Sequence, residues 1–184
     1  MGCLTSTTWL MPQEWRCTMT CKTIAVANQK GGTGKTATTL SLGIALAKLD
    51  KRVLLVDTDP QGDLTKSLGW ANPDSLEVTV ANHIQAVIEG IDLQADEGIL
   101  SHKEGIDLMP ANIDLASMEM SIFMAMSREQ ILKTWLSNIK DSYDYVLIDC
   151  APTLGILPIN AFVASDSVLI PVCLLYTSDA ADDK

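Results

Sequence analysis

The chain has 184 residues, a length that suits one domain of ordinary size. Hydrophobic residues make up 47% of it and charged residues 20%, a balance that excludes an intrinsically disordered protein. The formal net charge of -10, without any block of Lys and Arg, disfavours non-specific nucleic-acid binding unless the basic residues cluster on one face. No apolar run approaches the ~18 residues that cross a bilayer, and the cysteines show no metal or disulfide pattern, so we expect a cytoplasmic protein and no membrane.

Both ends of the chain look foreign to the sequence between them. Residues 1–18 show neither a helical nor a strand period, and Met19 offers a later start, so we interpret 1–18 as a non-native extension. The opening MGCLTS also fits the loose N-myristoylation pattern, which is the alternative. Residues 173–184 read CLLYTSDAADDK, which resembles a translated sequencing adapter; a genuine polar C-terminus is the alternative. The expected domain therefore comprises residues 19–172.

Hydrophobic periodicity predicts that strands alternate with helices along this domain. In chain order, we expect a strand at 23–28, a helix at 35–49, a strand at 52–57, a loop or short helix at 61–68, a helix at 78–89, a loop at 92–105, a strand at 106–110, helices at 114–124 and 128–140, a strand at 145–149, a helix that includes 160–164 and a strand at 167–172. Gly90 is expected to cap the end of one helix and Ser127 the start of another. The alternation predicts an α/β fold, a doubly wound and mostly parallel sheet with helices on both faces. Its active site should lie outside the carboxyl ends of the strands.

The loop after the first strand carries residues that bind phosphate. The ordinary pattern G-x-x-x-x-G-K-[ST] fails because Gln29 stands at its first glycine, and the chain instead reads KGGTGKT over 30–36. Glycines let the backbone N–H groups point at phosphate oxygens, and the following helix adds its positive N-terminal end. We expect Lys35 to reach the β- and γ-phosphates and Thr36 to offer its hydroxyl to Mg²⁺. The expected nucleotide-binding residues are Lys30, Gly31, Gly32, Thr33, Gly34, Lys35, Thr36 and Ala37.

The second lysine of this loop, Lys30, has no role in the ordinary pattern. With this lysine, the sequence resembles the ParA/MinD family of P-loop ATPases with a deviant Walker A loop, and its ParA/Soj branch in particular. The resemblance covers nearly all of 19–172 and includes LMPANIDLASME at 108–119 and INAFVASDSVLIPV at 159–172. It implies that ATP binding produces a homodimer in which Lys30 reaches the partner's nucleotide. A solvated loop lysine is the alternative.

Three aspartates at the ends of expected strands complete the predicted site. Asp57 and Asp59 lie in VDTDPQGDLT, and Asp149 ends the strand YVLID. A carboxylate after a buried strand lies at the sheet edge near Mg²⁺, which points to Asp149. The resemblance implies that Asp57 supports the Mg²⁺ site and that Asp59 orients the attacking water; the alternative for Asp57 is a cap on the next turn. The predicted catalytic residues are Lys30, Lys35 and Asp59, and the predicted metal residues are Thr36, Asp57 and Asp149.

As the resemblance implies, the leading hypothesis is an Mg²⁺-dependent ATPase that partitions a chromosome or plasmid. Its ATP-bound dimer would bind DNA non-specifically at the nucleoid, and a ParB-like partner would stimulate hydrolysis to ADP and phosphate. Family DNA contacts lie largely in a C-terminal portion that we expect to be missing here, so the acidic charge does not refute DNA binding. The alternatives are a MinD-like membrane-cycling ATPase with a C-terminal amphipathic helix, a metabolic enzyme on the same scaffold, and a regulator that binds ATP but scarcely hydrolyses it.

Overall fold

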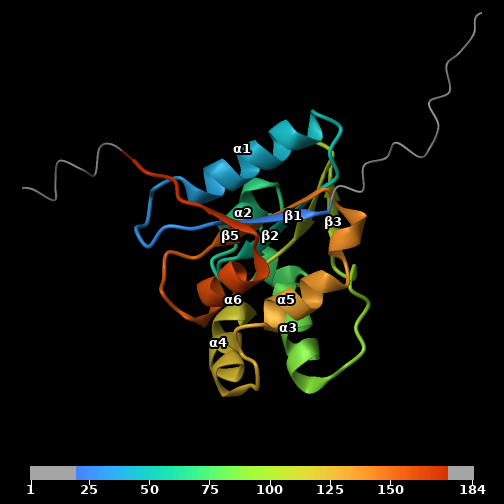
Figure 1. Cartoon of the computed structure of the whole chain (residues 1–184), viewed down its shortest axis with the longest axis vertical. Coiled ribbons are helices and arrows are strands. Elements are labelled where there is room, and N and C mark those ends of the chain that lie inside the picture. Colours follow the sequence, from blue (N-terminus) through green and yellow to red (C-terminus); the bar gives the residue numbers. More distant parts are fainter. Residues whose placement is uncertain (1–19, 174–184) are drawn as a thin grey trace, which may run out of the picture.

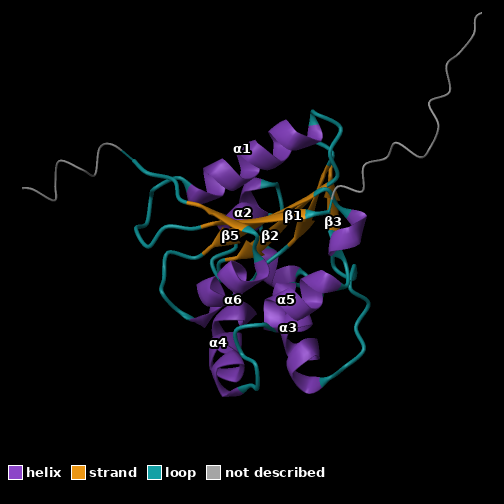
Figure 2. Cartoon of the chain, in the orientation of Figure 1, coloured by secondary structure: helices purple, strands orange, loops and turns teal. Residues whose placement is uncertain are grey.

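The structure is a computed structural model, and it describes residues 20–173. The expectations for 1–18 and for most of the C-terminal tail, 174–184, concern residues outside this range. Within it, one six-stranded sheet is covered by helices on both faces (Figures 1 and 2). This arrangement confirms the predicted α/β class. No helix in the described range is long and apolar enough to cross a membrane.

The sheet has the strand order β3-β4-β2-β5-β1-β6. Its strands are β1 (Lys22–Val26), β2 (Val53–Thr58), β3 (Leu100–His102), β4 (Ile106–Met109), β5 (Tyr145–Cys150) and β6 (Ser167–Leu169). Neighbouring strands run parallel, apart from the antiparallel pair β3 and β4. The carboxyl ends of the parallel strands therefore meet at one edge. The register of β2 and β5 pairs Asp57 with Asp149, which brings two of the predicted carboxylates side by side there.

Two hydrophobic clusters fix the helices to the sheet. Leu54 and Val56 of β2 lie in one cluster, while Val53 and Leu55 lie in the other, because successive side chains of a strand point to opposite faces. Helices α1 (Lys35–Ala47) and α2 (Asp63–Ser67) pack on the second face, above the sheet in Figure 1. The first face carries α3 (Val80–Glu89), α4 (Asp114–Met124), α5 (Ile131–Ser137) and α6 (Ile156–Ala164). Short 3-10 turns occupy Pro73–Ser75 and Lys140–Ser142.

Strand β3 lies inside the segment 92–105, for which the prediction of a loop was wrong. It has only three residues, pairs antiparallel with β4 at the edge of the sheet, and has no fully buried side chain. An edge strand this short has no buried apolar run, so hydrophobic periodicity gives no signal for it.

The cap predicted for α5 was also wrong, whereas the one predicted for α3 was correct. Ser127 has a φ of 51°, and its carbonyl accepts a hydrogen bond from the N–H of Gln130 at 2.8 Å. Ser127 therefore closes a separate turn, and the helix begins after Gln130 instead. Gly90 follows α3 with a φ of 68°, the left-handed conformation that glycine adopts without strain and that ends a helix.

Candidate nucleotide-binding site

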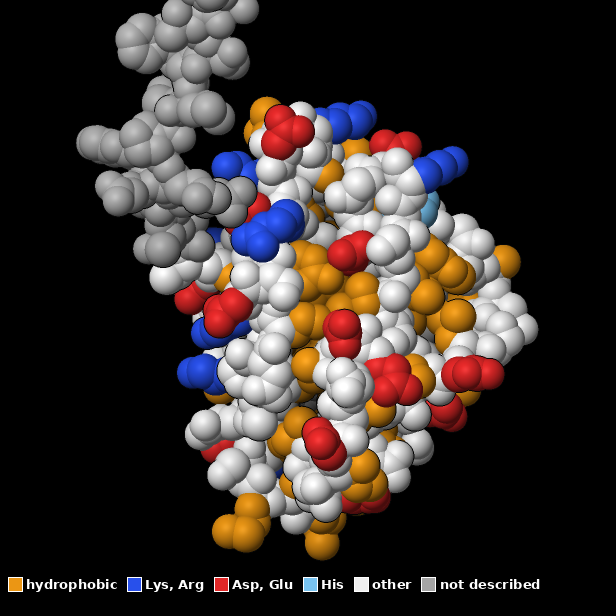
Figure 3. All heavy atoms as spheres, turned by 90° about the vertical axis from the view of Figure 1, so that its right-hand side faces the viewer, with side chains coloured by type: hydrophobic (Ala, Val, Ile, Leu, Met, Phe, Trp, Pro, Cys, Tyr) orange, Lys and Arg blue, Asp and Glu red, His pale blue; other side chains and the backbone are white. Residues whose placement is uncertain are grey.

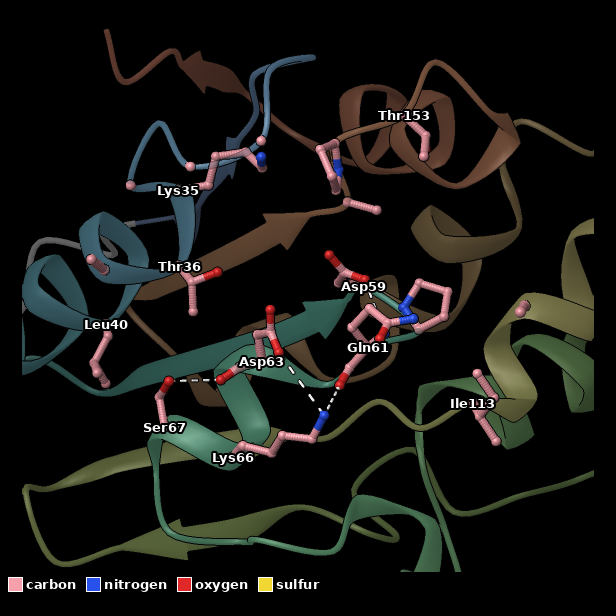
Figure 4. Close-up of a pocket in the computed structure, with 18 of the residues that line it drawn as sticks. Lys35, Thr36, Leu40, Asp59, Gln61, Asp63, Lys66, Ser67, Ile113 and Thr153 are labelled. Atoms are coloured by element: carbon pink, nitrogen blue, oxygen red, sulfur yellow. Dashed lines mark hydrogen bonds and ion pairs between the residues drawn. The ribbon is translucent and has the colours of Figure 1, made fainter. Parts of the chain in front are cut away.

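A cavity of about 1000 Å³ opens at the carboxyl ends of β1, β2 and β5. Its walls come from the loop between β1 and α1, the turn after β2, the start of α2, the helix α4 and the loop after β5. Figure 4 shows Lys35 and Thr36, from the start of α1, and Asp59, from the turn after β2, facing this hollow. Clefts of this size at this place in parallel sheets hold nucleotides and other small ligands.

The glycine loop leaves its backbone open to the cavity. Gly32 and Gly34 have φ values of 70° and 83°, which a residue with a side chain rarely adopts. A Cβ at Gly31 or Gly34 would meet no atom within 4 Å in the part of the chain that the structure describes. No described side chain caps α1, so the N–H groups of its first turn are left for a ligand. These features fit a phosphate group bound at the start of α1.

Lys35 is a nearly buried cation at the first position of α1. Its residue is 8% exposed, and its Nζ donates a hydrogen bond to the carbonyl of Lys30 at 3.2 Å. The Thr33 hydroxyl donates to the same carbonyl at 3.3 Å. The side chain of Lys35 thus lies along the loop and lines the cavity, as the sequence predicts for a phosphate-binding lysine.

Lys30 and Thr33 do not line the cavity, unlike most residues of the predicted nucleotide-binding set. Lys30 is exposed, and its backbone N–H donates to Oδ1 of Asn28 at 2.9 Å. The N–H and the carbonyl of Lys30 therefore both take part in hydrogen bonds within the loop. Its predicted reach to a partner's nucleotide stays a prediction.

Asp149 lies behind the glycine loop and is 1% exposed. Its Oδ1 accepts a hydrogen bond from the Thr39 hydroxyl at 3.2 Å. Burial raises the pKa of the Asp149 carboxyl to about 6, and hydrogen bonds from Thr36 and Thr39 oppose that rise. The charge of Asp59 raises the pKa further, whereas the charge of Lys35 lowers it. Three other predicted residues, Lys35, Thr36 and Asp59, therefore lie close enough to Asp149 to change the pKa of its carboxyl. The four residues come from three segments of the chain.

Asp57 is fully buried and does not line the cavity. Its Oδ1 accepts a hydrogen bond from the N–H of Asp59 at 3.1 Å. Its Oδ2 accepts bonds from the N–H of Thr65 at 3.0 Å and from the Thr65 hydroxyl at 2.7 Å. Burial raises the pKa of the Asp57 carboxyl to about 7, and these hydrogen bonds oppose the rise. Such contacts match a strand-end carboxylate that holds the next turn, the alternative that the sequence left open.

Asp59 begins a tight turn at the wall of the cavity opposite Lys35. Its Oδ1 accepts a hydrogen bond from the N–H of Gln61 at 2.9 Å, and its carbonyl accepts one from the N–H of Gly62 at 2.9 Å. The turn fixes where the carboxylate points while leaving it in contact with the cavity (Figure 4).

A Mg²⁺ ion would find fitting donors here. Within residues 20–173, no group of three or more His, Cys, Asp and Glu side chains could hold a metal by itself. Mg²⁺ at a nucleotide site, however, takes only one or two protein ligands, together with phosphate oxygens and waters. The hydroxyl of Thr36 beside the carboxylate of Asp149 supplies that donor set.

Several residues of the site were assigned no role from the sequence. Thr39 bonds to Asp149, the Thr58 hydroxyl donates to the carbonyl of Asp149 at 2.6 Å, and Thr65 bonds to Asp57. Thr39 lies three residues beyond Thr36, so helical spacing places both on one face of α1, and this spacing was the available signal. The role of Thr58 is recognisable only once β2 and β5 are aligned, and that of Thr65 only once α2 is packed beside Asp57.

The fold and the site define a P-loop nucleotide-binding protein. A family profile described as AAA domain matches residues 21–180. The sporulation initiation inhibitor protein Soj of Bacillus subtilis is 47% identical over 151 residues, which are 82% of this chain and 58% of that protein. The chromosome partitioning protein ParA of Caulobacter vibrioides is 37% identical over 153 residues, 82% of this chain and 55% of that one. The chain therefore belongs to the ParA/Soj family of ATPases with a deviant Walker A loop.

Solved structures agree with this assignment. One is described as cobyrinic acid a,c-diamide synthase from Mycobacterium smegmatis with bound ATP analog and magnesium; it is 44% identical with a TM-score of 0.76, over 83% of this chain and 60% of that one. The ATP complex of a McdA variant from Cyanothece is 27% identical with a TM-score of 0.71, over 83% and 56%. The chain spans little more than half the length of Soj and ParA, 58% and 55%.

Proposed function

We propose that the chain is the nucleotide-binding part of an ATPase switch that partitions a chromosome or plasmid, hydrolysing ATP to ADP and phosphate. The observation that carries the proposal is the placement of Lys35 and Thr36, with Asp149 behind them, at an open glycine loop. The relatives support the biological role, since ParA of Caulobacter vibrioides is described as a chromosome partitioning protein. A further structure, 29% identical with a TM-score of 0.69, over 82% of this chain and 62% of that one, is described as a putative plasmid partition protein of Borrelia burgdorferi bound to AMPPNP.

In this proposal, the loop and Lys35 hold the phosphates. The N–H groups of the first turn of α1 and of the glycine loop donate to phosphate oxygens, and the ammonium of Lys35 adds a charge-assisted bond. Thr36 and Asp149 would hold Mg²⁺, and Asp57 would support this edge of the site from behind. Magnesium held by these residues would supply positive charge that offsets the negative charge developing on the phosphates.

Asp59 would orient the water that attacks the γ-phosphate. Its Oδ1 accepts the N–H of Gln61, and a carboxylate has about four acceptor sites, so Asp59 can also accept a hydrogen bond from a water in the cavity. Positioning of this kind supplies much of the catalysis in phosphoryl transfer, because the protein makes few covalent contributions.

We further propose that the ATP state is a homodimer in which Lys30 reaches the partner's nucleotide. Its exposure and its place outside the cavity of its own chain support a role in trans. The alternative role, a solvated loop lysine, predicts no effect of Lys30 on assembly.

A ParB-like protein and non-specific DNA are the proposed partners, with the protein in the cytoplasm at the nucleoid. On the face shown in Figure 3, acidic side chains lie across the centre while lysine and arginine side chains lie toward the upper and left margins. The acidic centre of this face disfavours contact with DNA, and we propose that the DNA contacts lie in the portion of the relatives beyond the matched region.

The proposal is tested by following phosphate release from ATP with and without Mg²⁺ and double-stranded DNA, together with the oligomeric state in ATP and in ADP. We expect Mg²⁺-dependent release and a dimer only in ATP. Lys30→Ala should remain monomeric while still binding ATP. A chain that releases no phosphate under any of these conditions, or whose assembly ignores the nucleotide, contradicts the proposal.

A second candidate is a metabolic ligase, because the M. smegmatis structure at 44% identity is described as a diamide synthase. That function predicts that cobyrinic acid and an ammonia donor, rather than DNA, accelerate ATP consumption. Measuring the rate with each addition separates the two candidates.

A further inference from the structure

A buried chain of hydrogen bonds runs from the segment before α4 to the backbone of Asp59. The N–H of Ala111 donates to Oγ1 of Thr65 at 3.2 Å, and that hydroxyl donates in turn to Oδ2 of Asp57 at 2.7 Å. The other oxygen of Asp57 accepts the N–H of Asp59 at 3.1 Å. Ala111, Thr65 and Asp57 are each 0% exposed. Water therefore does not compete with these bonds, and loss of one leaves a buried group unpaired.

Thr65 occupies the central link of this chain. Its hydroxyl is both donor and acceptor, and its backbone N–H adds a second bond to Asp57 at 3.0 Å. It lies on α2, a helix of five residues that has no side-chain cap among the described residues. A helix this short is not stable alone, so its position depends on its tertiary contacts. The two contacts of Thr65 with Asp57 are buried, so water does not replace either of them if it is lost.

The turn that carries Asp59 lies in the chain between Asp57 and Thr65, which are hydrogen-bonded to each other. It begins at Asp59, whose N–H is held by Asp57, and it ends at Gly62, which directly precedes α2. A Cβ at Gly62 would lie 3.0 Å from the carbonyl of Ala111, so the turn also packs closely on the segment before α4. Ile113 of that segment lines the cavity together with Asp59. The buried bonds therefore connect the two walls of the cavity that carry Asp59 and Ile113.

On the basis of the proposed ATPase function, we propose that Thr65 is a positioning residue for hydrolysis, which fixes Asp59 at the cavity through Asp57 and ties its position to the segment before α4. Thr65 does not line the cavity, so it acts without touching the nucleotide. Its loss should slow hydrolysis while leaving ATP binding to Lys35 and the glycine loop intact.

The test compares Thr65→Val, which keeps the shape and removes the hydroxyl, with Thr65→Ser, which keeps the hydroxyl. We expect Thr65→Val to hydrolyse ATP at least about tenfold more slowly, a change of about 1.4 kcal/mol in the barrier. Its dissociation constant for ATP should stay within about twofold of that of the unmodified chain, and Thr65→Ser should restore most of the rate. Thr134→Val is a matched control, because it removes an exposed hydroxyl of α5 whose hydrogen bond, among the described residues, goes to the carbonyl of Gln130.

The outcomes separate this inference from the function on which it rests. If the unmodified chain neither binds nor hydrolyses ATP, both are overturned. If it hydrolyses ATP and folded Thr65→Val does so equally fast, or loses binding and hydrolysis together, only the positioning role is overturned. If Thr65→Val does not fold, Thr65→Cys takes its place, because a thiol keeps a weak hydrogen-bond donor. Thr65→Cys should bind ATP with a nearly unchanged dissociation constant and hydrolyse it more slowly, with a smaller loss of rate than expected for Thr65→Val.

Discussion

Replacement of Lys35 by alanine should weaken ATP binding by several orders of magnitude while leaving the fold intact. The ammonium has three donors, and among the described residues one of them bonds to the carbonyl of Lys30 at 3.2 Å. Two donors remain for phosphate oxygens. Hydrogen bonds to charged groups contribute about 1.5–3 kcal/mol each, so their loss amounts to about 3–6 kcal/mol, or about a 10²- to 10⁴-fold weaker affinity.

The same variant should be nearly as stable as the original chain. Alanine is a good helix former at the first position of α1, and the Lys30 carbonyl keeps the Thr33 hydroxyl as a donor at 3.3 Å. Isothermal titration with Mg²⁺-ATP measures the affinity, and thermal unfolding measures stability. Lys48→Ala, at the far end of α1, is the matched control and should bind ATP normally. Binding by Lys35→Ala within about threefold of the control would refute the role of Lys35, since even one lost charged hydrogen bond exceeds that change.

Three further changes test other parts of the account. Asp59→Ala should bind Mg²⁺-ATP normally but release phosphate more slowly, by about 10²-fold or more if it orients the water; normal turnover in a phosphate-release assay would count against that role. Gly43→Ala should destabilise the fold by up to about 2 kcal/mol in urea unfolding, because its Cβ would lie 2.7 Å from Cδ2 of buried Leu55. Overpacking of this kind costs about 1–3 kcal/mol, which outweighs the gain of about 1 kcal/mol in helix propensity. Burial lowers the pKa of His83 below its usual value, so the unfolded chain binds more protons near pH 6 and stability falls as the pH drops through about 6.5. His83→Gln should lose less stability than the original chain between about pH 7.5 and about pH 5.5; an equal loss would show that His83 does not contribute.

The sheet was predictable because most of its strands are buried apolar runs. The strand predicted at 52–57 is β2 (Val53–Thr58), whose side chains are all buried, and the one predicted at 145–149 is β5 (Tyr145–Cys150). Strand β3 escaped prediction because pairing at a sheet edge, and not burial, defines it. Helix α5 begins later than predicted because Ser127 adopts a left-handed turn that its residue type does not announce.

The candidate site was predictable where local sequence determines geometry, and not where it depends on distant contacts. The glycine loop, Lys35 and Thr36 are adjacent in sequence, so the motif alone places them together. The bond from Thr39 to Asp149 joins residues 110 positions apart, so the helical spacing of Thr36 and Thr39 does not by itself identify the partner of Thr39. The buried contacts of Asp57 also depend on where α2 packs, which explains why the sequence left two roles for this residue open.

Thr36 and Asp149 are proposed to form the Mg²⁺ site beside bound ATP. The most direct test is ATP affinity measured with Mg²⁺ and with EDTA, for the chain and for Thr36→Val. EDTA should weaken binding to the chain, whereas Thr36→Val should bind ATP as weakly with Mg²⁺ as without it. Equal affinity of the chain in both conditions, or a full Mg²⁺ effect in Thr36→Val, would contradict it.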